Sequence, residues 1–339
     1  MNLLPKPKKI TEKGGQLLLC HSMYIVISKE ISDNGIYAAK RLQEAIRQET
    51  GLLLRLSVGE TRDGDFSLRI TETLSEQAYE ITINENGVQI LGGDGAGVLY
   101  GVETFCQILQ QYGGALPCMQ IMDAPDMPNR GYYFDQTRGR ILKLEELKKI
   151  ADRMSLYKLN QLQLYVEHTY LFRDFSEMWR DQTPITAEEI RELDSYCRER
   201  HIELVPSLAS FGHLCTLLST KTYGELCEME DSWKEPFSFW NRMRYHTINV
   251  SDGRSLPLIK KMIAEYMQLF SSDKFNICAD ETFCLGKYKS KELAKECGIH
   301  RLYIDYVKEL AQFLVENGKI PMFWGDIIWN SPELMKELP

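Results

Sequence analysis

The chain lacks an extended run of basic residues. Its longest basic stretch is Lys6-Pro7-Lys8-Lys9, and the 339 residues carry a net charge of -8 at pH 7. Nucleic acids and anionic membranes attract surfaces rich in lysine and arginine, so neither is expected as a partner. A neutral or cationic ligand is easier to accommodate.

Long apolar runs are also missing. Residues 1–6 have no apolar stretch of the kind found in a secretion signal, and Leu17-Leu18-Leu19 is too short for a signal or a membrane span. We therefore expect a cytoplasmic protein. The nine cysteines are scattered and form no CxxC pair, which is typical of reduced core thiols. The sequence predicts no metal site and no cofactor.

A phosphate-binding loop is absent as well. The glycine cluster at 92–97 stands between a predicted strand and a predicted helix, but it fits neither GxxxxGK[ST] nor GxGxxG. We interpret it as a tight turn.

Residues 1–125 alternate strand-like and helical segments, which predicts a small α/β domain with a mainly antiparallel sheet. Short strands at 66–70, 78–83 and 88–91 are expected, and the turn signal at 84–87 favours an antiparallel hairpin. The proline-containing segment 123–128 is interpreted as a linker to a second domain, 126–339.

From Arg130 onward, strands alternate with helices, a pattern typical of an α/β domain with parallel strands. Five strands are predicted, at 131–135, 161–166, 202–208, 275–279 and 320–324. A complete eight-stranded barrel usually takes about 250 residues, and fewer than that follow Met127. The sequence therefore predicts a TIM-type (β/α) barrel that is incomplete at its C-terminus.

Polar and aromatic side chains follow each predicted strand. In chain order they are Asp135 and Arg138, Glu167 and His168, His213, Asp280 and Glu281, and Trp324 and Asp326. The C-terminal ends of barrel strands meet at one face, where active sites lie, so this joint occurrence predicts an active site. For His168 or His213 taken alone, a hydrogen-bonded core histidine is the alternative.

The adjacent acids Asp280 and Glu281 close the apolar run 275–279. Two carboxyl groups withdrawn from water tend to have their pKa values pushed apart, so that one stays charged while the other carries a proton. That arrangement suits acid catalysis of glycoside cleavage. Because neighbouring side chains of a regular strand point to opposite faces, we predict that the backbone turns where this strand ends.

These features resemble glycoside hydrolase family 20, the β-N-acetylhexosaminidases and their relatives. The similarity covers essentially the whole chain, including 97–105, Arg130-Gly131 with Asp135 and Arg138, Lys158-Leu159-Asn160, Phe211-Gly212-His213 and the acid pair. The chain also departs from the family pattern. Asn276 replaces a histidine, Cys278-Ala279 replace two glycines, and 164–168 replaces a His-Trp-His-Leu stretch, which indicates a divergent branch.

The resemblance implies removal of terminal β-linked N-acetylhexosamine, GlcNAc or GalNAc, from a glycan or glycoconjugate by substrate-assisted retaining catalysis. Asp280 would orient the 2-acetamido group, and Glu281 would act as acid and then base. The substrate-binding residues would be Arg130 and Asp326 with polar contacts, Trp324 with its ring face, and His213, Glu167 and His168 as a network around Glu281. A helix-sheet salt bridge for Arg130 and core packing for Trp324 are the structural alternatives.

Two other functions remain open. The chain could be a non-catalytic carbohydrate-binding module or an inactive truncated barrel. It could also be a different barrel hydrolase with separated carboxylates, in which Asp135 or Asp326 is the partner of Glu281.

Overall fold

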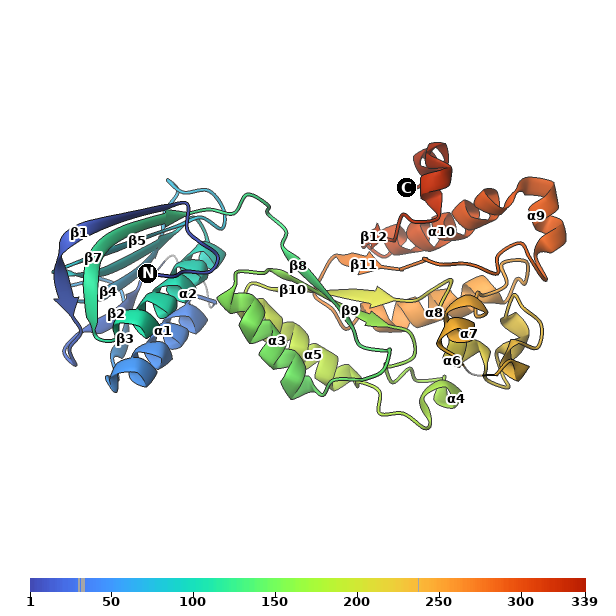
Figure 1. Ribbon diagram of the computed structural model, residues 1–339, viewed down its shortest axis with the longest axis horizontal. Helices are drawn as coiled ribbons and strands as arrows, with labels where there is room; N and C mark the ends of the chain where they lie inside the picture. The colour runs from blue at the N-terminus through green and yellow to red at the C-terminus, as the bar shows by residue number, and fades with distance from the viewer. Residues whose placement is uncertain (30, 32–33, 237) are drawn as a thin grey trace. The chain divides into compact units, whose positions relative to one another are not determined.

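The computed structural model describes residues 1–29, 31, 34–236 and 238–339. The chain forms two compact units (Figure 1). The first contains 1–131, 148–161 and 196–202, and the second contains 132–147, 162–195 and 203–339. The domain boundary at 125/126 stays a prediction from the sequence, and the first compact unit also includes the two later segments.

The first unit is built on a mixed sheet with two helices. Its described strands are β1 (Lys9–Leu18), β2 (Tyr24–Ile27), β3 (Arg55–Val58), β4 (Phe66–Ile70), β5 (Tyr79–Asn84), β6 (Gly87–Gly92) and β7 (Ala115–Asp123), in the order β1-β7-β5-β6-β4-β2-β3. The predicted β5-β6 hairpin is confirmed. The sheet is mixed rather than mainly antiparallel, because β2 pairs in parallel with β3 and β4, and β4 with β6. Parallel neighbours need a crossover, and α1 (Asn34–Thr50) supplies the one from β2 to β3.

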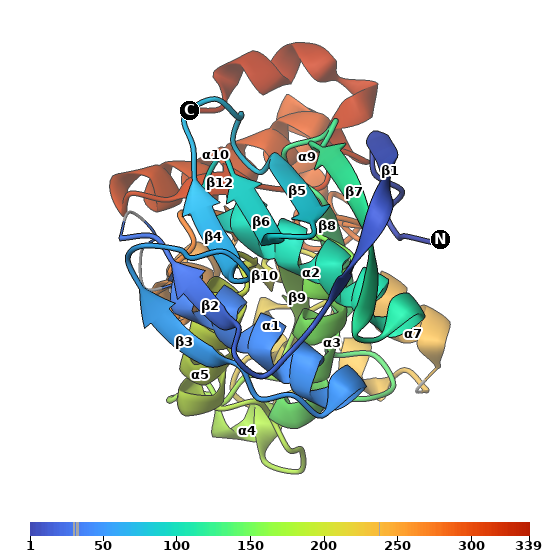
Figure 2. The same cartoon turned by 90° about the vertical axis from the view of Figure 1, so that its left-hand side faces the viewer.

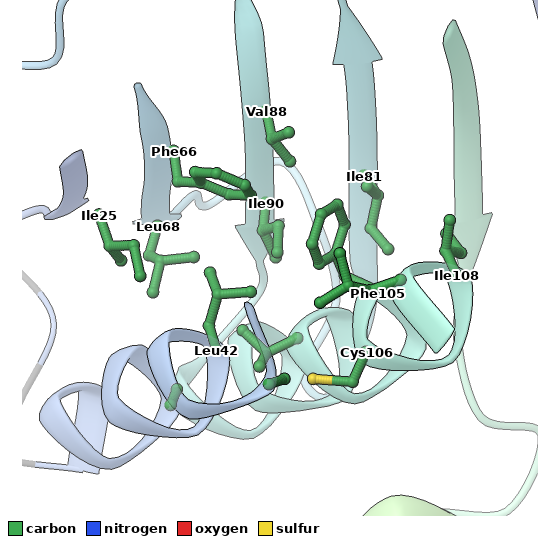
Figure 3. Close-up of a cluster of buried hydrophobic side chains, with 14 of the residues drawn as sticks. Ile25, Leu42, Phe66, Leu68, Ile81, Val88, Ile90, Phe105, Cys106 and Ile108 are labelled. Atoms are coloured by element: carbon green, nitrogen blue, oxygen red, sulfur yellow. The ribbon is translucent and has the colours of Figure 1, made fainter. Parts of the chain in front are cut away.

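The two helices α1 and α2 (Gly95–Tyr112) cover one face of this sheet (Figures 1 and 2). Buried side chains from the strands and from both helices meet in the layer between them, as Figure 3 shows. Phe66 of β4 and Phe105 of α2 contact edge to face, with ring centroids 5.4 Å apart. Both rings are fully buried, and truncating such a side chain to alanine typically costs about 3–5 kcal/mol.

The glycine cluster between β6 and α2 forms the tight turn that the sequence predicts. A Cβ on Gly93 would lie 1.9 Å from the carbonyl oxygen of Ser75, so only glycine allows the two backbones to approach this closely. Asp94 caps α2 by accepting a hydrogen bond from the Gly97 amide at 2.7 Å. The cluster is therefore accounted for by packing and helix capping.

The second unit contains a second sheet, with helices between its strands. The described strands are β8 (Gly131–Asp135), β9 (Gln161–Val166), β10 (Glu203–Leu208), β11 (Lys274–Asn276) and β12 (Ile320–Met322), in the order β12-β11-β10-β9-β8. The pairs β10/β11 and β11/β12 are parallel. All five strands were predicted, although β11 and β12 end earlier than expected. Within the described residues β8 and β12 form the two edges, so the sheet does not close into a barrel there.

Helices connect these strands in the alternating pattern that the sequence predicts. They are α3 (Leu144–Leu156), α4 (Ser176–Trp179), α5 (Ala187–Glu199), α6 (Cys215–Leu218), α7 (Phe239–Arg244), α8 (Ser255–Met267), α9 (Lys291–Cys297) and α10 (Ile299–Glu316). Thr186 and Glu189 exchange hydrogen bonds with each other's backbone amides in a capping box before α5. In the described part of the chain, none of the helices combines the length and apolarity needed to cross a bilayer.

Candidate active site

The chain leaves β11 through a left-handed turn that carries the acid pair. The strand ends at Asn276, and Cys278, Ala279 and Glu281 have φ values of 58°, 60° and 49°. Such values are uncommon for residues other than glycine and cost on the order of 1–3 kcal/mol each. They explain why the predicted strand 275–279 stops three residues early. They also coincide with the positions where the family pattern has two glycines.

Hydrogen bonds from three other segments hold this turn in place. Ser210 donates to the carbonyl of Ile277 at 2.6 Å, the Trp324 amide to that of Cys278 at 2.9 Å, and the Tyr303 hydroxyl to that of Ala279 at 3.0 Å. A strained backbone persists only when its surroundings over-determine it, and these bonds supply that restraint.

One imidazole contacts both acids. The Nε2 atom of His213 lies 3.4 Å from Oδ2 of Asp280 and 3.3 Å from Oε2 of Glu281. His213 is buried, whereas the side chain of Asp280 is 25% exposed and that of Glu281 is 41% exposed. The two neighbouring carboxylates therefore contact the same imidazole and are both partly exposed. The predicted turn of the backbone is confirmed.

The position of His213 depends on the residue before it. His213 follows β10 and has a left-handed backbone, with φ 60°. A Cβ on Gly212 would lie 2.5 Å from the carbonyl oxygen of Asp280. The Gly-His pair therefore allows the loop after β10 to touch the loop after β11, and the imidazole then reaches both carboxylates.

The acids around His213 raise its pKa. Burial by itself lowers the pKa of His213, but the hydrogen bond to Asp280 and the negative charges of Asp280, Glu167 and Glu281 outweigh it, so the pKa is raised above its ordinary value. The Nδ1 atom has no hydrogen-bond partner among the described residues.

Glu167, predicted from its place after β9, is the centre of a buried network. Its Oε2 accepts a hydrogen bond from Nη2 of Arg242 at 2.9 Å, and its Oε1 accepts one from the Tyr165 hydroxyl at 3.0 Å. Nδ1 of His168 lies 3.9 Å from the same carboxylate. Burial, with the nearby charge of Arg242, lowers the pKa of His168 to about 4, so this imidazole is neutral at pH 7. Sequence reasoning missed Arg242, because it belongs to a loop helix with no strand-end signal.

Trp324 and Asp326 follow β12, and both contact the acid-bearing turn. The Trp324 ring is 40% exposed and packs edge-on against Tyr133 of β8, with centroids 5.2 Å apart. Its neighbour Asp326 accepts a hydrogen bond from the Glu281 amide at 3.3 Å. An apolar ring surface and a further carboxylate thus lie beside Glu281.

Arg130 makes different contacts from those that the resemblance implies. Its guanidinium donates hydrogen bonds to the carbonyls of Met127, Pro128 and Lys158 and to the Tyr100 hydroxyl, all within the first unit. Among the described residues no carboxylate pairs with it, so the alternative of a helix-sheet salt bridge is wrong. The arginine joins loop carbonyls at the start of β8, and a role in sugar binding has no support in these contacts.

Arg138, unlike Arg130, belongs to the second unit. Its Nε lies 2.6 Å from Oδ2 of Asp135, and its guanidinium carbon lies 4.9 Å from the centre of the Tyr165 ring, whose hydroxyl contacts Glu167. The sequence placed Arg138 after the first barrel strand without assigning it a role. Its place at the C-terminal end of β8 was the signal that could have found it.

In the ranges that the structure describes, no cluster of three or more His, Cys, Asp or Glu side chains has a geometry suited to hold a metal ion. The polar groups near the strand ends of the second unit are carboxylates, an imidazole that contacts two of them, and arginines. These are the components needed for proton transfer and for binding hydroxyl or amide groups.

Comparison with known families agrees with this chemistry. Residues 1–124 match the model described as glycosyl hydrolase family 20, domain 2, and residues 127–338 match the family 20 catalytic domain. The chain belongs to glycosyl hydrolase family 20. The catalytic domain of this family 20 protein thus includes every strand of the second sheet described above.

Known relatives share the family but are longer. A beta-hexosaminidase of Porphyromonas gingivalis is 23% identical over 97% of this chain and 46% of its own length. One of Akkermansia muciniphila is 30% identical over 50% of this chain and 36% of its own. A Flavobacterium johnsoniae chitobiase superposes with a TM-score of 0.83 at 21% identity, covering 96% of this chain and 52% of that one. The family 20 chain thus spans about half the length of the curated relatives it matches. The structural likeness places its second sheet in a TIM-type catalytic domain.

Proposed function

We propose that this family 20 chain removes terminal β-linked N-acetylhexosamine from glycans or glycoconjugates. The observation that carries the proposal is the pair of neighbouring carboxylates, Asp280 and Glu281, that share the Nε2 atom of His213. Relatives described as beta-hexosaminidase and as chitobiase support the substrate class.

We further propose that the substrate's own acetamide is the nucleophile. Most retaining glycosidases hold two carboxyl groups about 5–5.5 Å apart on opposite sides of the bond, and one of them attacks the sugar. Here the acids are consecutive in sequence and contact one imidazole, which favours a mechanism in which the acetamide attacks the anomeric carbon from the face opposite the leaving group. One acid then orients the amide, and the other transfers the proton.

The reaction follows from these roles. The acetamide oxygen forms a bond to the anomeric carbon as the glycosidic bond breaks, and Glu281 gives its proton to the departing oxygen. Asp280 stabilises the positive charge that develops on the acetamide as the oxazolinium ring forms. Glu281, now a carboxylate, takes a proton from water, and the resulting hydroxide equivalent opens the ring with retention of configuration.

Exposure separates the two acids in the way that these roles require. Glu281 is the more exposed, which suits a group that exchanges protons with a leaving group and with water. Asp280 is more enclosed, which suits a group that holds the acetamide in place and faces the cation that develops on it. In this proposal Arg138 and the Trp324 ring bind sugar hydroxyls and the sugar's apolar face.

The test is hydrolysis of an aryl β-N-acetylglucosaminide by the chain and its variants. Glu281→Gln and Asp280→Asn should each lower kcat/KM by about 10²- to 10⁴-fold, whereas Glu296→Gln, at an exposed acid of α9, should leave it unchanged. The matching aryl β-glucoside has no acetamide and should be a very poor substrate. Equal rates on the two substrates would contradict the acetamide mechanism, and unchanged rates in both acid variants would remove the catalytic assignment.

A second candidate is a carbohydrate-binding protein without turnover, favoured by the two open edges of the second sheet in the described residues. It predicts that N-acetylhexosamine binds while no sugar is released. The hydrolase with separated carboxylates is less well supported. Asp135 is paired with Arg138, and Asp326 accepts a hydrogen bond from the Glu281 amide. Neither carboxylate is therefore free to act as the second catalytic acid with Glu281.

A further inference from the structure

The first unit contains a cavity that the proposed reaction does not use. Its volume is about 360 Å³, within the range of roughly 300–1,000 Å³ typical of small-molecule sites. Its walls are largely apolar, formed by Pro5, Tyr79, Tyr100, Pro125 and Met127. Lys158 also lines it.

Lys158 is an unusual residue for such a place. It is only 5% exposed, and its Nζ has no hydrogen-bond partner among the described residues. Lysine is almost never fully buried unless it is paired, because the ammonium loses its hydration. The residue also has a left-handed backbone, with φ 61°. Its Nζ lies 5.7 Å from the centre of the Tyr79 ring, a contact that replaces only part of the lost hydration.

The cations of the cavity lining are Lys6, Lys8, Arg130 and Lys158, and among the described residues no carboxylate forms an ion pair with Lys158 or Arg130. Arg130 donates only to neutral oxygens. Lys8 is paired with Asp126 at 2.6 Å. Asp123, the remaining acid of the lining, accepts hydrogen bonds from the Tyr79 hydroxyl at 3.0 Å and from the Lys8 amide at 3.3 Å.

Other charged groups influence Lys158 from outside the lining. Glu103 is buried behind the cavity and is paired with Arg41 at 3.2 Å. Burial lowers the pKa of Lys158 to about 8, opposed by the negative charges of Asp123 and Glu103 and assisted by Arg130. The amine is therefore still mainly protonated at pH 7.

We propose that this cavity binds a small organic monocarboxylate. Its carboxylate would accept a hydrogen bond from Nζ of Lys158, and its hydrocarbon part would pack against the apolar lining at Pro5, Pro125 and Met127. A single negative charge balances the lysine, whereas the second charge of a phosphate would be repelled by Asp123. The proposal uses residues of the first unit only and does not depend on glycoside cleavage.

Isothermal titration calorimetry with benzoate tests the proposal on the 339-residue chain at pH 7. Benzoate should bind, and benzamide, which has the same shape without the charge, should bind at least tenfold more weakly. Inorganic phosphate should bind more weakly than benzoate as well. Lys158→Met keeps the apolar stem and should weaken benzoate binding at least tenfold. Lys40→Met, at an exposed lysine of α1 that does not line the cavity, should change it by less than threefold.

The pH dependence gives a readout that needs no variant. Benzoate stays ionised from pH 6 to 9, so its affinity should be constant up to about pH 7 and then fall by up to tenfold per pH unit above about pH 8 as Lys158 loses its proton. The profile keeps the proposal testable if Lys158→Met does not fold, as judged by circular dichroism. Absence of benzoate binding, equal binding of benzamide, or a flat pH profile would each overturn the proposal.

Discussion

The two units each continue a buried strand into a tight turn, but they use different residues to do so. After β6 in the first unit, glycine removes the side chain where Gly93 meets the backbone of Ser75. After β11 in the second, Cys278, Ala279 and Glu281 keep their side chains at positive φ. The first turn gains close packing, whereas the second carries strain at the point where two carboxylates are brought together. Backbone strain of this kind gathers at functional sites.

The largest expected effect comes from breaking the glycine turn. Gly93→Ala should lower the free energy of unfolding by about 3 kcal/mol, because the new methyl group meets a backbone carbonyl that cannot move aside. Gly14→Ala, where a Cβ meets nothing within 4 Å, is the matched control and should stay within about 0.5 kcal/mol of the parent. Urea unfolding followed by circular dichroism measures both. A tolerated Gly93→Ala would mean that the close approach is not required.

Arg130 of the first unit and Arg138 of the second show the same contrast between a structural and a functional role. Arg130→Met should lower stability by about 2 kcal/mol, because several carbonyls lose their donor. Arg138→Met should instead raise KM for an aryl N-acetylhexosaminide about tenfold or more, with a smaller effect on stability. Unfolding curves and steady-state kinetics on both variants separate the outcomes. If KM rose in Arg130→Met and not in Arg138→Met, the result would support the sugar contact of Arg130 that the resemblance implies.

Much of the fold could be predicted from the sequence because burial leaves a periodic signal. The five strands of the second sheet are short apolar runs, and each was found at its place in the chain. The end of β11 was missed because Ile277, Cys278 and Ala279 are as buried as strand residues, and hydrophobicity carries no information about φ. The parallel pairs of the first sheet were missed because a hairpin signal is local, whereas a crossover depends on the α1 connection.

The candidate site was predictable where a side chain follows a strand directly. Asp280, Glu281 and His213 were all expected there, and their contacts agree with that expectation. Arg242 could not be found, because its loop helix carries no periodic signal that points to Glu167. Lys158 was noted only as part of a family segment, since its burial comes from the tertiary packing of segments far apart in the chain.

Replacing Ala279, which has a left-handed backbone in the turn after β11, tests whether that turn is strained. Ala279→Gly should raise the free energy of unfolding by about 0.5–1 kcal/mol. Glycine relieves a cost of about 1–2 kcal/mol at φ 60°, and the greater freedom of the unfolded chain offsets part of that gain. Ala311→Gly, in the regular helix α10, is the control and should destabilise by about 1 kcal/mol. Equal destabilisation in both variants would show that the turn after β11 is not strained.

The smallest expected effect concerns the charge of His213. Because its folded-state pKa is raised, protonation favours the folded chain. The stabilising contribution is complete below the unfolded value near pH 6.5 and is lost as the pH rises through the folded value. The stability difference between the parent and His213→Gln should therefore shrink from pH 5.5 to pH 8.5.

The stability difference for His168→Gln should change with pH in the opposite direction. Its imidazole has a pKa lowered to about 4, so the parent should lose stability relative to that variant as the pH falls from 6.5 toward 4. Urea unfolding across this range measures both slopes, and a His213 difference that grows with pH would contradict a protonated imidazole between the two acids.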